Sequence, residues 1–136
     1  MNADEHGLIM SLEREDITKE IIGAAFEVHN ELGYGFLEKV YQNAMIVALK
    51  LRGITAESEK LIQVHFRDHI VGDFKADLTV EDVIVELKVA QKYNPKDEPQ
   101  LLNELAATKS PVGLLINFGK EKVEFKRFIS STKPSV

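Results

Sequence analysis

The sequence predicts a mixed α/β (α+β) fold, with a central mixed sheet flanked by helices in the order ααβββαββ. Apolar residues recur at helical spacing over 17–32 and 36–52. Apolar and polar residues then alternate between 60 and 90, as in half-buried strands. Finally, a short helical pattern precedes the nearly all-apolar run 112–118, which is typical of a strand covered on both faces.

Length and composition favour one ordinary globular domain, with 136 residues, 44% hydrophobic and 29% charged. The chain has no cysteine, which excludes disulfides and thiolate metal sites. It shows neither an apolar run of the roughly 20 residues that span a bilayer nor a signal-peptide pattern, so a cytoplasmic protein without membrane contact is expected. The expected division is a flexible lead-in at 1–15, a single domain at 16–129 and a flexible tail at 130–136.

The first helix is expected to begin after Asp16, a suitable N-cap, and to end at Gly33. The second is expected over 36–52 and should pack against the first as an antiparallel pair, because the connection is short. Its expected inner face consists of Leu37, Val40, Tyr41, Ala44, Ala48 and Leu51.

Strands are expected at 60–66, 71–80 and 83–90. The acidic pair Glu81-Asp82 separates the last two, so an antiparallel hairpin is expected there.

The length of this connection decides which side chains meet. With two or four residues, Asp77 lies directly across from Glu86, and Lys88 projects from the same face. With an odd number, Asp77 moves to the opposite face. Two facing carboxylates repel, and a divalent cation between them would remove that penalty. The residues therefore predict a hard-metal site formed by the two carboxylates, a backbone carbonyl of the 86–88 step and waters.

A third helix is expected from Asp97 to about Lys109, with Asp97 and Gln100 at capping-box spacing. Its expected buried side chains are Leu101, Leu102, Leu105 and Ala106. Strands at 112–118 and 123–129 complete the chain, and the first of them should run parallel to the strand before the helix.

Asp77 followed by Glu86-Leu87-Lys88 resembles the PD-(D/E)XK nuclease core, in which Glu-x-Lys on the second strand lies beside an Asp from the first. The segment GFLEKVY at 35–41 resembles the signature of the GxxExxY protein family, which is assigned to the same superfamily. The resemblance runs from about Ile17 to Ile129. It implies a restriction-endonuclease-like core and a nuclease that hydrolyses phosphodiester bonds of DNA or RNA with Mg²⁺ or Mn²⁺.

The resemblance also implies roles for particular residues. Asp77 and Glu86 bind the metal, which polarises a phosphodiester and lowers the pKa of the attacking water. Lys88 orients or deprotonates that water, or stabilises the charge on the phosphorane-like oxygens. Glu38 reaches the metal directly or through water, and Gln100 positions phosphate or water.

Each of these residues also has a plainer interpretation. Asp77, Glu86 and Lys88 form a solvated sheet face with a carboxylate–lysine pair. Glu38 is then a surface glutamate near a helix N-terminus, and Gln100 part of a capping box.

Tyr41 mainly fixes the surroundings of Glu38, or is simply a core aromatic residue whose hydroxyl is hydrogen-bonded at the rim. The family often has an aromatic residue where Glu104 stands, and this departure argues against a stacking role for the third helix.

The formal net charge of −5 weighs against broad nucleic-acid binding, because proteins that bind the phosphate backbone usually carry a basic face. Any basic patch must be local. Two other functions stay open: a non-catalytic binding or scaffold module on a nuclease-like fold, and a metal-dependent hydrolase of a small phosphorylated ligand. The sequence leaves the oligomeric state open, a homodimer included.

Overall fold

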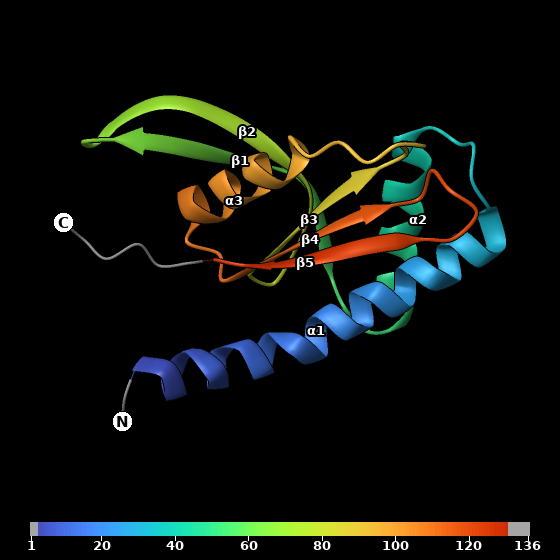
Figure 1. Ribbon diagram of the computed structural model, residues 1–136, viewed down its shortest axis with the longest axis horizontal. Helices are drawn as coiled ribbons and strands as arrows, with labels where there is room; N and C mark the ends of the chain where they lie inside the picture. The colour runs from blue at the N-terminus through green and yellow to red at the C-terminus, as the bar shows by residue number, and fades with distance from the viewer. Residues whose placement is uncertain (1–2, 131–136) are drawn as a thin grey trace.

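The computed structural model describes residues 3–130, and the side chains of residues 14–130. Along the chain the elements are α1 (Ala3–Leu32), α2 (Glu38–Leu51), β1 (Ala56–Phe66), β2 (His69–Val80), β3 (Val83–Lys88), α3 (Asp97–Thr108), β4 (Val112–Asn117) and β5 (Glu124–Ile129) (Figure 1). The mixed α/β class and the order ααβββαββ are confirmed.

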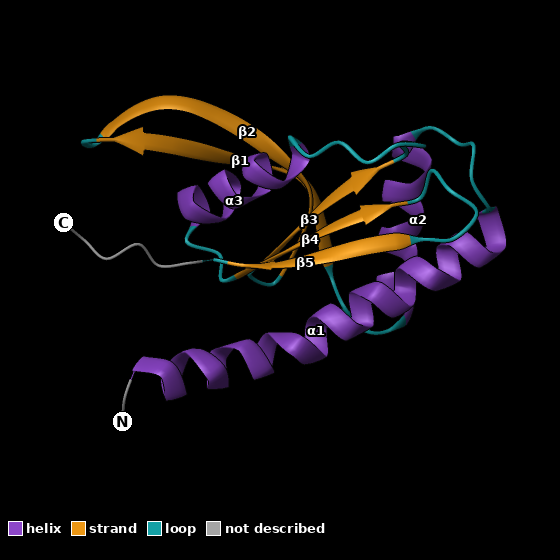
Figure 2. Ribbon diagram, in the orientation of Figure 1, coloured by secondary structure: helices purple, strands orange, loops and turns teal. Residues whose placement is uncertain are grey.

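The five strands form one sheet in the order β1-β2-β3-β4-β5. Neighbouring strands are antiparallel except β3 and β4, which are parallel because α3 connects them. The hairpin of β1 and β2 extends beyond the other strands on the side where α3 lies (Figure 2).

The sheet is covered on both faces, and each face has its own apolar core. Helices α1 and α2 cover one face, where the strand residues of the core are Leu78, Val80, Val83, Val85, Leu87, Val112, Leu114 and Ile116. Helix α3 covers the other face, where the smaller cluster consists of Ala76, Ile84, Leu101, Leu105, Leu115 and Phe128. Strand β4 contributes to both, as its apolar sequence predicts.

The hairpin of β2 and β3 has the predicted even-length connection. Val80 pairs with Val83, so the turn consists of Glu81 and Asp82, and Glu81 has a positive φ of 54°. The pairing of β2 with β3 ends at Leu78 and Val85, one residue before Asp77 on β2 and Glu86 on β3.

Helix α1 begins at Ala3, upstream of the expected start, so Asp16 lies inside the helix and is not its cap. The division into a flexible lead-in, one domain and a flexible tail stays a prediction. Of these segments, residues 1–2 and 131–136 lie outside the described residues. No helix within residues 3–130 is both long and apolar enough to cross a membrane.

The buried face of helix α2 agrees only in part with the expected one, because Tyr41 and Ala48 are buried as expected but other members of the expected face are not. Leu37, just before the helix, and Leu51 at its end are 80% and 84% exposed. The buried side chains are Tyr41, Gln42, Met45, Ala48 and Leu49. The helix carries two apolar rows, and helical spacing alone cannot select the one that meets the core.

The start of α3 also differs from the expectation. The capping position belongs to Lys96, without a side-chain cap, and Asp97 is the first helical residue, so the capping box with Gln100 does not form. Leu101 and Leu105 are buried as expected, but Leu102 and Ala106 are exposed, and Glu104 is buried instead.

Candidate active site

Strand β2 is irregular at Asp77. Ala76 belongs to the apolar cluster under α3, and Leu78 to the core under α1 and α2, although regular alternation would place both on one face. The pairing with β1 skips Asp77 as well, and Glu59, the residue opposite, has a positive φ of 54°. The strand therefore changes the face it presents at the position of the predicted metal ligand.

Polar contacts outside the ladder hold Asp77 in place. Its carbonyl accepts a hydrogen bond from Nε2 of Gln42 at 2.7 Å, and its Oδ2 accepts one from the backbone N–H of Leu87 at 2.8 Å. The first bond ties the aspartate to α2 and the second to β3. Gln42 is buried and was not among the predicted site residues. Gln42 could have been identified as a polar residue that follows Tyr41 on the buried side of α2.

Glu86 lies between two other acids. Burial raises the pKa of Glu86 to about 10, and the charge of Asp77 and the neighbouring carboxylate of Glu104 add to this effect. Within the described residues, no hydrogen-bond donor reaches its buried Oε1. A carboxylate in such surroundings is stable only with a proton or a cation beside it.

Glu104 belongs to the acid cluster but was not among the predicted site residues. It is 7% exposed on α3, between the buried Leu101 and Leu105. Burial raises its pKa, while hydrogen bonding with Glu86 and Gln100 acts in the opposite direction. Its position four residues after Gln100, on the side of the helix that carries the buried leucines, is the signal that could have identified it.

Lys88 lies beside these acids. Its Nζ is 3.6 Å from Oδ1 of Asp97, and its carbonyl accepts a hydrogen bond from the N–H of Phe118 at 2.8 Å. The lysine charge lowers the pKa of Glu38 and of Glu104, which places the amine within electrostatic reach of both.

The ends of β3 and β4 are fastened together next to Lys88. The side chain of Asn117 donates to the carbonyl of Ala90 at 2.7 Å and accepts from its N–H at 3.0 Å. Gly119 passes so close to Val89 that a Cβ would lie 2.4 Å from the Val89 carbonyl carbon, so only glycine fits there.

Glu38 is the first residue of α2 and faces the same site. Burial raises the pKa of Glu38, the charge of Asp77 raises it further, and Lys88 lowers it. The helix N-terminus therefore brings a third element, besides the β2–β3 hairpin and α3, to the acids.

Tyr41 has a structural position. Its side chain is fully buried, and its ring stacks on Phe118 with centroids 4.7 Å apart. The hydroxyl donates to the carbonyl of Gly33 at 2.6 Å and accepts from the N–H of Phe36 at 3.3 Å. Tyr41 thus holds the turn that leads into Glu38 and does not join the acids.

The structure brings most of the predicted site residues together. They are Asp77, Glu86, Lys88, Glu38 and Gln100, joined by Glu104 and bordered by Tyr41. Within the part of the chain that the structure describes, no three histidine, cysteine, aspartate or glutamate side chains form a complete metal-ligand set. Paired carboxylates with an oxygen that lacks a donor fit a hard cation that keeps several waters, as Mg²⁺ does.

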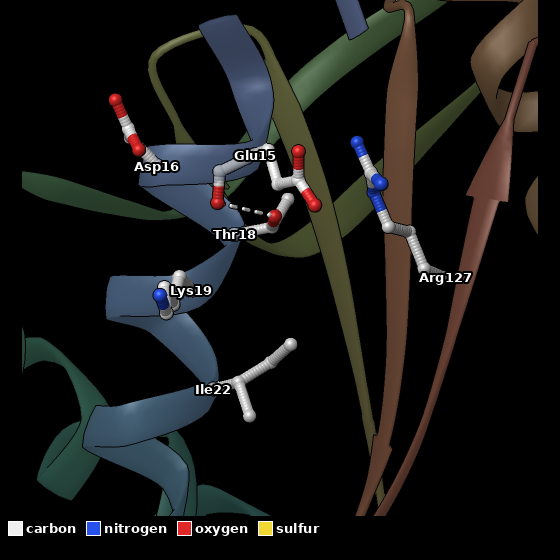
Figure 3. Close-up of a pocket in the computed structure, with 6 residues that line it drawn as sticks. All are labelled: Glu15, Asp16, Thr18, Lys19, Ile22 and Arg127. Atoms are coloured by element: carbon white, nitrogen blue, oxygen red, sulfur yellow. Dashed lines mark hydrogen bonds between the residues drawn. The ribbon is translucent and has the colours of Figure 1, made fainter. Parts of the chain in front are cut away.

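A recess of about 480 Å³ lies elsewhere, between α1 and β5 (Figure 3). It is lined by Glu15, Asp16, Thr18, Lys19, Ile22 and Arg127. It contains none of the clustered acids, so it is separate from the candidate active site.

Comparison with known proteins gives a family and a fold. The model of a family described as the PD-(D/E)XK nuclease superfamily matches residues 15–128. The crystal structure of SSO0001 is similar at a TM-score of 0.54 and 17% identity, which shows the fold alone. The match covers 90% of this chain but 62% of SSO0001, so the chain spans less than two thirds of that protein.

A second solved structure is LHK-Exo in complex with dAMP, at a TM-score of 0.47 and 13% identity. That match covers 79% of this chain and 76% of LHK-Exo. No curated protein matches the chain.

Proposed function

Since the chain belongs to the PD-(D/E)XK nuclease superfamily, we propose that it is a metal-dependent nuclease that hydrolyses phosphodiester bonds of DNA or RNA. Within the superfamily we assign it to the GxxExxY family, on the GFLEKVY segment at 35–41. The observation that carries the proposal is the pairing of Asp77 with Glu86 beside Lys88, where β2 changes face.

Asp77 and Glu86 are the residues that would hold Mg²⁺ or Mn²⁺. The N–H of Leu87 holds the carboxylate of Asp77 and the Gln42 amide holds its backbone carbonyl, so the carboxylate is positioned before any ligand arrives. Glu86 lacks a donor at Oε1, and a cation would replace the proton that burial otherwise imposes. When bound, the metal polarises the phosphodiester and makes water a better nucleophile at neutral pH.

Three further side chains act around this pair. Lys88, held near the site by Asp97, orients the attacking water or stabilises charge on the phosphate oxygens. Glu38, the first residue of α2, would reach the metal directly or through water, and Gln100 positions phosphate or water from α3.

A non-catalytic binding module is the alternative, and two observations favour it. The chain carries a net charge of −5, and Lys88 is paired with Asp97 rather than directed at the acids alone. A module of this kind would bind a partner without cleaving it.

A cleavage assay separates these functions. Single- and double-stranded DNA and RNA are incubated with the full chain in Mn²⁺, in Mg²⁺ and in EDTA. We expect cleavage with metal, none in EDTA, and strong loss in Glu86→Gln and Lys88→Ala. Glu98→Gln is the matched control, because Glu98 is a carboxylate of α3 that pairs with Lys126 outside the site.

Two results would overturn the proposed function. One is no metal-dependent cleavage of any of these substrates by the wild type. The other is equal cleavage by the wild type and Glu86→Gln, which would point to a contaminating nuclease.

A further inference from the structure

The acid cluster contains a carboxylate to which the proposed mechanism gives no task. Glu104 is more than nine-tenths buried, and no donor in the described part of the chain reaches its Oε2. Its side chain interacts with Glu86 and is hydrogen-bonded with Gln100. Glu104 is therefore directed at a predicted metal ligand rather than at solvent.

Packing alone gives no reason for an acid at this position. The buried neighbours of Glu104 on α3 are Leu101 and Leu105, which pack in the apolar cluster of that face. A buried carboxylate with one oxygen that lacks a donor is costly, and a leucine or methionine would avoid that cost. The arrangement of facing acids becomes favourable when a positive charge lies between them.

We propose that Glu104 is a further carboxylate ligand of the active-site cation, which it binds from α3 together with Glu86. This inference rests on the proposed function, because it assigns one more ligand to the same metal site. It adds α3 to the elements that hold the cation, which otherwise come from the β2–β3 hairpin alone.

Asp77, Glu86 and Glu104 do not all interact with one another in the same way. Glu86 interacts directly with both Asp77 and Glu104, whereas Asp77 affects Glu104 through its charge only. Glu86 is thus the acid that interacts with both of the others, although within the described residues the three do not converge as a complete metal-ligand set. Water completes the coordination of a hard cation held in this way.

Gln100 gains a task from this arrangement. It lies one helical turn before Glu104, and hydrogen bonding between the two side chains orients the carboxylate. Gln100 therefore acts as a positioning residue for Glu104. This is a separate role from the capping box that does not form.

Direct measurement of Mn²⁺ binding to the full chain tests the inference without relying on activity. Calorimetry, supported by electron paramagnetic resonance of free Mn²⁺, is applied to the wild type, Glu104→Gln, Glu104→Asp, Glu86→Gln and the control Glu98→Gln. Glu104→Gln preserves the shape of the side chain, and circular dichroism confirms that each variant is folded.

We expect Glu104→Gln to weaken Mn²⁺ binding about tenfold or more, because it removes one of few charged oxygen ligands. Glu104→Asp should bind more tightly than Glu104→Gln, because it keeps the charge. Glu98→Gln, which removes the same charge from the same helix outside the site, should bind like the wild type.

The outcomes separate the two proposals. If Glu104→Gln binds like the wild type while Glu86→Gln does not bind, this inference is overturned and the proposed function stands. Equal weakening in Glu104→Gln and Glu98→Gln also overturns it, since the effect would then be one of net charge. If the wild type binds no Mn²⁺, the proposed metal-dependent function falls and the inference falls with it.

Discussion

The two faces of β3 differ in what they bury. Toward α1 and α2 the strand presents Val83, Val85 and Leu87, all fully buried in the larger apolar core. Toward α3 it presents Ile84, Glu86 and Lys88, of which only the first is apolar. Six consecutive residues thus contribute to a packed core on one side and to a charged cluster on the other.

The difference teaches where stability and chemistry lie in this fold. Leu87 packs in the core, while its own N–H holds the carboxylate of Asp77 on the opposite side. The apolar face therefore fixes the backbone that orients the acids. The acids on the other face repel one another, which lowers stability. The fold tolerates this cost because the larger apolar core supplies most of the stabilisation.

The largest expected effect on stability comes from removing a side chain from the apolar face of β3. Leu87→Ala should lower the free energy of unfolding by about 2–5 kcal/mol, because it leaves a cavity in a fully buried position. Urea denaturation followed by circular dichroism measures this. A loss below about 1 kcal/mol would mean that the core on this side is looser than its burial indicates.

Glu86→Gln, one residue earlier, should have the opposite effect: a large loss of cleavage with no loss of stability. We expect metal-dependent cleavage to fall at least about hundredfold. The free energy of unfolding without metal should stay equal or rise, because glutamine is neutral at every pH and replaces an acid that must keep its proton beside two other acids. Cleavage kinetics and urea denaturation of the same preparation check both parts. A variant that is inactive because it is unfolded would contradict the division between the faces.

The acidic face should also make stability depend on pH. The pKa of Glu86 rises from 4.5 to about 10 on folding, so the folded state holds its proton more tightly than the unfolded state does. The contribution of this group is complete below about pH 4.5 and is lost progressively as the pH rises toward 10.

Urea denaturation at several pH values without metal should therefore show stability falling through neutral pH. The slope of the free energy of unfolding against pH should be smaller in Glu86→Gln. In the wild type Mg²⁺ should reduce this slope, because a cation replaces the proton. Identical slopes in the wild type and Glu86→Gln would show that Glu86 is not the group responsible.

The smallest expected effect concerns Tyr41, which borders the acids but belongs to the core. Tyr41→Phe removes the hydroxyl that bridges Gly33 and Phe36 and should cost about 1 kcal/mol of stability. Cleavage by the folded variant should remain close to the wild-type level. A large loss of cleavage with little loss of stability would instead assign Tyr41 to the reaction.

Much of the fold was accessible from the sequence, because it depends on local periodicity. Alternation places Asp77 and Glu86 on one face once the two-residue turn is accepted, and the paired register confirms that turn. The succession of strand, helix and apolar strand predicts the parallel pair of β3 and β4, which the structure contains.

Other features were decided only by the tertiary structure. Local spacing shows which positions of a helix share a side, but not which side meets the core, so the buried face of α2 was predicted only in part. Gln42 and Glu104 were not predicted for a related reason. Their partners, Asp77 and Glu86, lie far away in the sequence. Whether a buried polar group is held by a hydrogen bond or left facing another acid depends on such distant contacts, and no local pattern records them.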